Sequence, residues 1–246
     1  MIKIIFAYTS LFLFCTTMAV AAEQQFESDT FKTPGGNLGI TFVGHGTIMI
    51  FFGSKVIHVD PVSQMADYAK LPKADLILIT HEHSDHFDLK AIDLVKTAKT
   101  KIVATETVAR QISDATIMKN GDIRTIGGLR IEAVPAYNLV NIRSPGNPFH
   151  PKGIGNGYII DFGDKRLYIA GDTENTPEMK TLQGIDIAFL PMNLPYTMTP
   201  EMVADAAKAF RPKILYPYHY GNTDTAKLTL LLKDTTGIEV RIRKMQ

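Results

Sequence analysis

The strongest constraint in this sequence is the stretch THEHSDH, which directly follows the apolar run 76–79. It places three histidines and an aspartate within six residues, at the point where a buried strand would end. Neutral imidazole and carboxylate are the groups that zinc and other borderline divalent ions bind. A merely polar loop explains the pattern poorly, because three neighbouring imidazoles repel one another when protonated. We therefore expect a metal site that includes His81, His83, Asp85 and His86.

The first 22 residues have the pattern of an export signal. Lys3 precedes the apolar run 4–14, and the small residues Ala21 and Ala22 offer a cleavage site. The run is short for a membrane span, so we expect a cleaved signal and a periplasmic or secreted protein. An uncleaved anchor is the alternative, and no stable membrane anchor is expected.

Charge and cysteine content exclude several classes of protein. Residues 1–22 contain Lys3 and no acidic residue, so the rest of the chain carries 25 of the 26 basic residues and all 25 acidic residues. This balance does not suggest a nucleic-acid surface, and we expect a small-molecule partner instead. The single cysteine, Cys15, lies in the signal, so the mature chain has no disulfide and no thiolate ligand or nucleophile. The sequence does not indicate an oligomeric state.

A chain of 246 residues with 45% hydrophobic residues fits one large α/β domain or two small ones. We expect residues 23–37 to form a polar tether and residues 38–246 to form the folded domain. β-Branched and aromatic runs predict short strands at 38–43, 47–52, 55–59 and 101–105. Apolar periodicity predicts a helix at 89–98, with Asp88 as its N-cap.

Two segments recur in the second half of the chain. Phe52-Gly-Ser-Lys55 is matched by Phe162-Gly-Asp-Lys165, and the run beginning at Asp75 is matched by the run beginning at Asp186. The same order and nearly the same offset favour an internal duplication. Helices at 199–210 and 224–232 and strands at 213–217 and 238–242 complete the second half. Two mixed sheets packed face to face, with helices outside, are the architecture that this pattern implies.

THEHSDH, together with Gly171-Asp172-Thr173 and His219, resembles the metallo-β-lactamase superfamily of metal-dependent hydrolases. The resemblance covers nearly all of residues 38–246. Segments 44–47, 59–61 and 158–173 resemble its lactonase-like and phospholipase-like branch. The resemblance implies a four-layer αββα sandwich with the metal site at one edge of the sheets.

The resemblance also implies a ligand set for two ions. Site one would use His81, His83 and a third histidine; site two would use Asp85, His86 and His219; Asp172 would bridge them. The third histidine normally follows a Pro-Ala strand end, but Asn138 occupies that place here. We expect the loop 139–149 to fold back so that His150 supplies the ligand. Ligation by Asn138, or one weakly held ion, are the alternatives.

The resemblance implies hydrolysis of an ester, a lactone or a phosphodiester by a hydroxide that two divalent ions activate. Zinc is the expected ion, with manganese or iron as alternatives. Asp85 is the candidate catalytic residue, because it could orient the nucleophile or pass its proton to the leaving group. Hydrolysis of β-lactams, or a non-hydrolytic metal-binding or redox role on the same fold, are the alternative functions.

Several further polar residues are candidates on weaker grounds. Loop residues that could contact substrate are His45, Tyr137, Asn138, Asn193 and Tyr196, although solvated loop positions explain most of them equally well. Asp60, at the end of a strand, is a candidate to orient a ligating histidine. His58 lies on the same face of that strand, and we expect it to form a bond within the sandwich.

Overall fold

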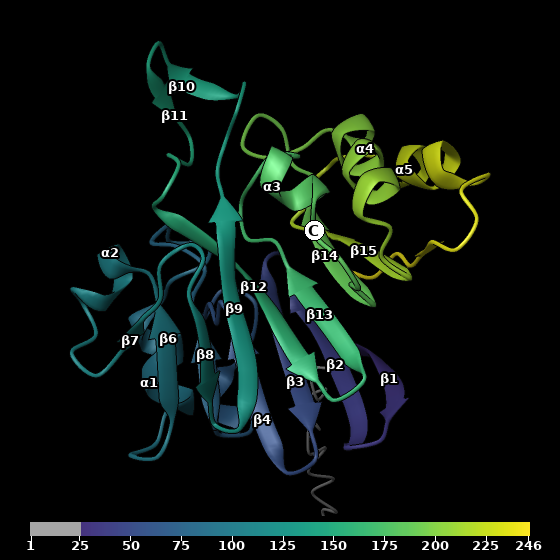
Figure 1. The fold of residues 1–246 in the computed structure, drawn as a ribbon. Helices are drawn as coiled ribbons and strands as arrows, with labels where there is room; N and C mark the ends of the chain where they lie inside the picture. The colour runs from purple at the N-terminus through teal and green to yellow at the C-terminus, as the bar shows by residue number, and fades with distance from the viewer. Residues whose placement is uncertain (1–25) are drawn as a thin grey trace, which may run out of the picture.

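Two mixed sheets of seven strands each pack face to face (Figure 1). The computed structural model describes residues 26–246, so the predicted export signal at 1–22 lies outside the described residues. The first sheet has the strand order β1 (Glu27–Thr33), β2 (Gly36–Gly44), β3 (Thr47–Phe52), β4 (Lys55–Val59), β5 (Leu76–Leu78), β6 (Lys101–Ala104) and β7 (Thr116–Ile117). The second has the order β16 (Glu239–Val240), β15 (Ile214–Tyr218), β14 (Ile187–Pro191), β13 (Lys165–Ile169), β12 (Gly155–Phe162), β9 (Leu129–Ala136) and β8 (Ile123–Ile126).

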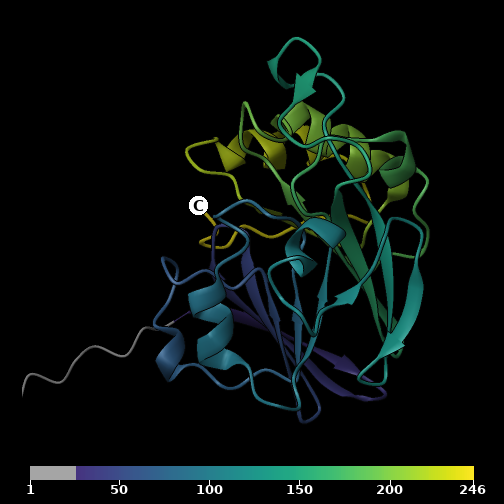
Figure 2. The ribbon, with the colours of Figure 1, turned by 90° about the vertical axis from the view of Figure 1, so that its left-hand side faces the viewer.

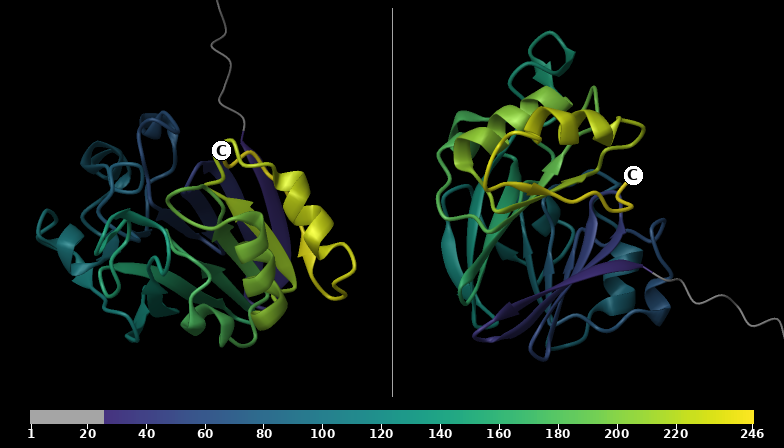
Figure 3. Two further views of the ribbon diagram at one scale, coloured as in Figure 1. Left: turned by 90° about the horizontal axis from the view of Figure 1, so that it is seen from above. Right: turned by 90° about the vertical axis from the view of Figure 1, so that its right-hand side faces the viewer.

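Helices cover the outer face of each sheet, which completes the predicted αββα layers (Figure 2). The first sheet is covered by η1 (Tyr68–Lys70), α1 (Leu89–Val95) and α2 (Glu106–Ala109). The second is covered by α3 (Pro177–Lys180), α4 (Pro200–Phe210) and α5 (Thr225–Leu232), and α4 and α5 lie side by side (Figure 3). A small hairpin of β10 (Ile142–Ser144) and β11 (Asn147–Pro148) stands apart from both sheets. Among residues 26–246, no helix is both long and apolar enough to cross a bilayer.

The two sheets repeat one plan of strand directions. In the first sheet β1 to β4 pair antiparallel, and β4 to β7 pair parallel. The second sheet repeats this sequence, with β8, β9, β12 and β13 antiparallel and β13 to β16 parallel. The matched hairpins of the sequence join β3 to β4 and β12 to β13. The predicted duplication is therefore confirmed at the level of topology.

The prediction of a tether at 23–37 is wrong for residues 27–33, which form β1. This strand pairs along its whole length with β2, from Glu27 opposite Phe42 to Thr33 opposite Gly36. Asp29 fixes the strand to the end of the chain, since Arg243 donates to its carboxylate at 2.8 Å. The polar character of the segment reflects an edge strand with one exposed face, a pattern that resembles a loop.

Element boundaries differ from the prediction by a few residues. The helix expected at 89–98 ends at Val95, because Lys96 is extended and a turn closes from Thr97 to Thr100. Asp88 is its N-cap and accepts hydrogen bonds from the backbone nitrogens of Lys90 and Ala91. Helix α4 begins and ends as predicted, with Thr199 as its N-cap.

His58 forms a hydrogen bond, as expected, but it lies on the outer face of the first sheet and not between the two sheets. Its neighbours across the ladder, Met49 and Ile77, belong to the apolar cluster under α1. The ring packs against Tyr68, and its Nε2 donates to the carbonyl oxygen of Pro72 at 3.0 Å. Burial lowers the pKa of His58 from 6.5 to about 4.

This histidine should weaken the protein in acid. Because its pKa is lower in the folded state, the unfolded chain binds the proton first, and stability falls as the pH drops from about 6.5 towards 4. The variant His58→Gln keeps a donor for Pro72. Between pH 7 and pH 4.5, we expect its free energy of unfolding to fall by about 2 kcal/mol less than that of the wild type. Urea unfolding of both proteins at the two pH values measures the difference. Equal losses would contradict the assignment.

Candidate metal centre

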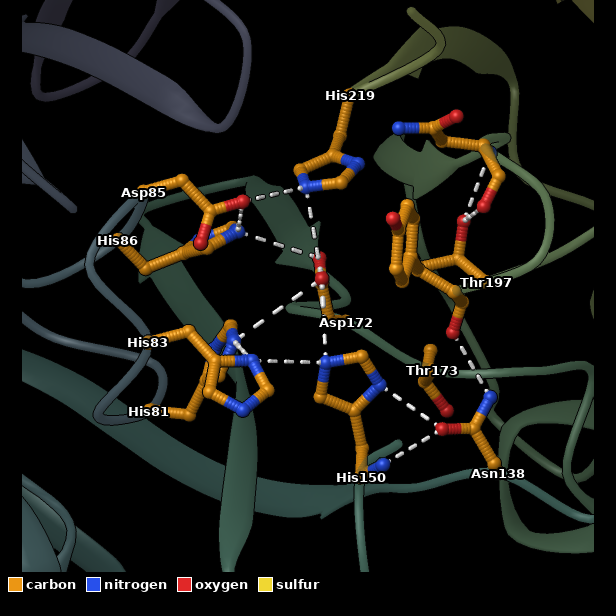
Figure 4. A network of polar contacts seen from close by, with 12 residues as sticks. His81, His83, Asp85, His86, Asn138, His150, Asp172, Thr173, Thr197 and His219 are labelled. Carbon is orange, nitrogen blue, oxygen red and sulfur yellow. Dashed lines mark hydrogen bonds and ion pairs between the residues drawn. The ribbon is translucent and has the colours of Figure 1, made fainter. Parts of the chain in front are cut away.

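Polar residues that lie far apart in the sequence meet where the strands of both sheets end. The THEHSDH loop follows β5, Asp172 follows β13 and His219 follows β15. Carboxyl ends of parallel strands share one edge of a sheet, and the face-to-face packing brings the two edges together. Figure 4 shows Asp172 at the centre of the resulting cluster.

The first group of donors consists of three histidines. His81 Nε2 and His150 Nε2 each lie 3.2 Å from His83 Nδ1. His150 Nε2 is also 3.3 Å from Asp172 Oδ2. These three ring nitrogens lie within 4.8 Å of one another, which is close enough for one ion to contact all three. The structure therefore brings His150 to the place where the sequence suggested a third histidine.

The second group gathers around Asp85. Its Oδ2 lies 3.3 Å from His219 Nε2, 3.2 Å from His45 Nε2 and 3.8 Å from His86 Nε2. Asp172 connects this group to the first, since its Oδ1 is 3.3 Å from His86 Nε2 and its Oδ2 is 3.4 Å from His219 Nε2. All four donors of the second group are again within 4.8 Å of one another. His45, expected as a substrate contact, is a member of this group.

The turn that carries His45 has a backbone suited to close approach. His45 has a φ of 51°, in the left-handed region, and its ring centroid lies 3.8 Å from that of His219. A Cβ at Gly46 would lie 2.6 Å from His86 Cε1, so only glycine fits there. The turn thus holds the His45 ring against His219 and leaves room for the His86 ring.

A buried chain of hydrogen bonds orients two of the histidines from behind. His86 Nδ1 lies 2.8 Å from Asp60 Oδ2, and Thr80 Oγ1 donates to the same oxygen at 2.6 Å. His81 Nδ1 is 2.9 Å from Thr80 Oγ1, so one carboxylate fixes both imidazoles. Asp60 thus lies where the sequence suggested an orienting residue. Thr80 was not predicted, because nothing distinguishes a threonine at the end of a strand.

Asn138 lies behind His150 and does not point into the cluster. Its Oδ1 accepts hydrogen bonds from the backbone nitrogen of His150 at 2.7 Å and from Nδ1 at 2.8 Å. Its Nδ2 donates to Glu174 and to the carbonyl oxygen of Tyr196. The amide is therefore fully used in holding the loop and the imidazole, while Nε2 of His150 faces His83.

Glu174 anchors the loop between Asn138 and His150, a role that no sequence pattern indicated. The carboxylate is fully buried. Its Oε2 accepts from the backbone nitrogens of Leu139 and Val140, at 2.8 and 2.9 Å. Its Oε1 accepts from the backbone of Asn141 at 2.7 Å and from Asn138 Nδ2 at 3.1 Å. Each oxygen thus accepts two hydrogen bonds from the base of the loop.

Replacing this carboxylate by an amide should loosen the loop. Glu174→Gln places an NH₂ group against N–H donors, so we expect about 2–3 kcal/mol of lost stability and faster hydrogen exchange at residues 139–141. Thermal unfolding and exchange mass spectrometry measure both effects. Glu106→Gln, at an exposed position, is the control. If exchange at 139–141 is unchanged, another contact anchors the loop.

Known proteins resemble the chain along most of its length. A sequence profile for the "Beta-lactamase superfamily domain" matches residues 39–219. The chain belongs to the metallo-β-lactamase superfamily.

The relatives within this superfamily are metal-dependent hydrolases. "UPF0173 metal-dependent hydrolase TK0141" of Thermococcus kodakarensis is 36% identical over 196 residues, 74% of this chain and 84% of the relative. A crystal structure from Parabacteroides distasonis, described as a metal-dependent hydrolase, has 52% identity and a TM-score of 0.86, over 90% of this chain and all of that one. Igni18, a metallo hydrolase of Ignicoccus hospitalis, shares the fold with 24% identity and a TM-score of 0.71, over 85% and 95% of the two chains. The chain is therefore a metal-dependent hydrolase.

The charge state of the cluster suits metal binding in this hydrolase. Burial and neighbouring imidazoles lower the pKa of His81 and of His83, so both rings are neutral near pH 7 with lone pairs to offer. Although burial opposes it, His219 and His86 lower the pKa of Asp172, so this carboxylate is ionised. Within the described residues, His86 Nε2 and Asp172 Oδ1 have no hydrogen-bond partner although both are buried. These two atoms lie 3.3 Å apart, so a metal ion bound beside both would satisfy them.

The hydrolase also has a cavity of about 380 Å³ beside the cluster. Asn193 and Tyr196 line it, together with Asp85 and His45. Tyr137 does not line it, and its hydroxyl group donates to Glu178 at 2.9 Å. Of the five weak candidates for substrate contact, three therefore face the cavity, whereas Tyr137 and Asn138 are used in holding the loop.

Proposed function

We propose that the chain is a hydrolase with two divalent metal ions that cleaves an ester, a lactone or a phosphodiester of a small molecule. The observation that carries this proposal is the pair of donor groups that share Asp172. Site one would be His81, His83 and His150, and site two would be Asp85, His86 and His219, with Asp172 between them. The histidine-rich donor set favours zinc over magnesium or calcium, with manganese or iron as alternatives. We also propose that the chain is exported through residues 1–22.

Bound ions would lower the pKa of a water molecule and offset the negative charge that develops on the attacked group. The side chain of Asp85 is 45% exposed, so it can reach this water from the cavity. Although burial opposes it, hydrogen bonds with His219 and His45 lower the pKa of Asp85. An ionised Asp85 would accept a hydrogen bond from the attacking water and orient it. Asn193 and Tyr196 would contact the part of the substrate that extends into the cavity.

Metal removal provides the direct test. We expect about two ions per chain by mass spectrometry, and hydrolysis by the loaded protein of at least one member of a panel of chromogenic esters, lactones and phosphodiesters, with a β-lactam included. A chelator should abolish turnover, and added zinc should restore it. A fully loaded protein that cleaves no member of the panel would favour a metal-binding role without hydrolysis. Cleavage of the β-lactam alone would place the chain among the antibiotic-degrading enzymes.

A further inference from the structure

The loop between Asn138 and His150 carries Arg143 over the metal centre. Residues 142–144 form β10, in the hairpin that projects beyond the ends of β9 and β12 (Figures 1 and 2). Arg143 lines the same cavity as Asp85, His150 and His219. The hairpin therefore places a cationic side chain in the cavity where the proposed substrate would lie.

The base of this loop is fixed in a way that orients the arginine. Glu174 binds the backbone of residues 139–141, and Asn138 binds His150 at the other end. Asn141 Nδ2 also donates to the carbonyl oxygen of Thr197 at 2.9 Å, which ties the loop to the segment that carries Tyr196. Hydrogen bonds thus connect the base of the hairpin to the opposite wall of the cavity.

Arg143 lies against an aromatic ring and has no carboxylate partner. Its guanidinium carbon is 5.5 Å from the ring centroid of Phe149, whose edge-on neighbour Tyr196 lies 5.1 Å away between ring centroids. Within residues 26–246, no Asp or Glu forms an ion pair with Arg143, whereas Arg130, Arg166 and Arg241 are each paired with one. A guanidinium stacked on a ring keeps its N–H groups free for a planar anion.

Electrostatics makes an anionic ligand the expected partner of this group. The proposed ions and the guanidinium of Arg143 add positive charge to the same cavity, so a ligand with negative charge beside both is attracted by both. Carboxylate and phosphate groups match the fork of an arginine with two parallel hydrogen bonds.

We propose that the substrate carries a carboxylate or phosphate group separate from the bond that is cleaved, and that Arg143 binds this group. Phe149 and Tyr196 contact the apolar part of the substrate between the two ends. This inference rests on the proposed function, since it takes the scissile bond to lie at the metal centre. It narrows the substrate class to esters, lactones or phosphodiesters that carry a further anionic group away from the cleaved bond.

Binding of a matched pair of acids tests the subsite without any turnover. Adipate and hexanoate have equal chain length, and each has a carboxylate for the metal centre, but only adipate has a second one. With zinc-loaded wild type, we expect calorimetry to show adipate binding about 10- to 100-fold more tightly than hexanoate. Arg143→Gln should abolish the preference by lowering adipate affinity to about that of hexanoate. Arg143→Lys should retain part of it, and the exposed Arg124→Gln is the control.

The same comparison with substrates separates the two proposals. The 4-nitrophenyl monoester of adipic acid and 4-nitrophenyl hexanoate differ only in the second carboxylate, so kcat/KM should show a similar preference that Arg143→Gln removes. An adipate preference without cleavage of any ester, lactone or phosphodiester would keep the anionic subsite and overturn the proposed hydrolysis. Cleavage of both esters with no preference for the adipate monoester would overturn the subsite and keep the hydrolysis. A preference for the adipate monoester that survives in Arg143→Gln would do the same.

Discussion

Replacing His150 by alanine should reduce bound metal from about two ions to about one per chain. The variant removes one of the three nitrogens that converge beside His83 and leaves the donors around Asp85 in place. Loss of an orienting residue alone lowers metal affinity about 10- to 100-fold, so loss of a donor should lower activity by at least about 100-fold. Metal analysis after dialysis against zinc-free buffer measures the stoichiometry.

Two further variants make this result specific. Asn138→Ala removes the residue behind the imidazole but keeps Nε2, so we expect weaker metal binding with the second ion still measurable at high zinc. His58→Ala removes a buried imidazole outside the cluster, and its metal content should match the wild type. If His150→Ala keeps two ions, His150 is not a ligand. If Asn138→Ala loses more metal than His150→Ala does, the asparagine is the donor.

Asp60→Asn should weaken metal binding at the second group without removing any donor from it. Asp60 Oδ2 faces His86 Nδ1 at 2.8 Å and holds a proton there, so Nε2 is the nitrogen that can bind an ion beside Asp172. An amide NH₂ in that place would favour the opposite tautomer, with a proton on Nε2. We expect metal affinity to fall about 10- to 100-fold, with a parallel loss of activity.

The control for this variant is another buried aspartate, Asp186. Asp186 is also buried, and its carboxylate accepts a hydrogen bond from the backbone nitrogen of Arg166 outside the cluster. Asp186→Asn should therefore lose stability without losing metal affinity. Zinc titration with a competing chromogenic chelator measures both variants. Equal metal affinity of Asp60→Asn and wild type would show that the carboxylate does not set the tautomer of His86.

Local sequence patterns predicted the two sheets and the outer helices but not the edge strand β1. The two Phe-Gly hairpins and their apolar strands predicted the duplication because turns and alternation are short-range features. Strand β1 could not be predicted in this way. Its place in the sheet depends on Asp29 pairing with Arg243, 214 residues away, and on backbone pairing with β2 along one edge.

The same division holds within the metal centre. The sequence by itself determined that His81, His83, Asp85 and His86 lie close together, because a short loop after a buried strand leaves them no room to separate. It also indicated His150, but only as one of three alternatives. The tertiary structure decided that Asn138 lies behind that histidine, that Glu174 holds its loop, and that His45 joins the second group. These contacts join residues 12 to 40 positions apart, on loops that strand pairing within each sheet places side by side, so short-range sequence patterns do not reveal them.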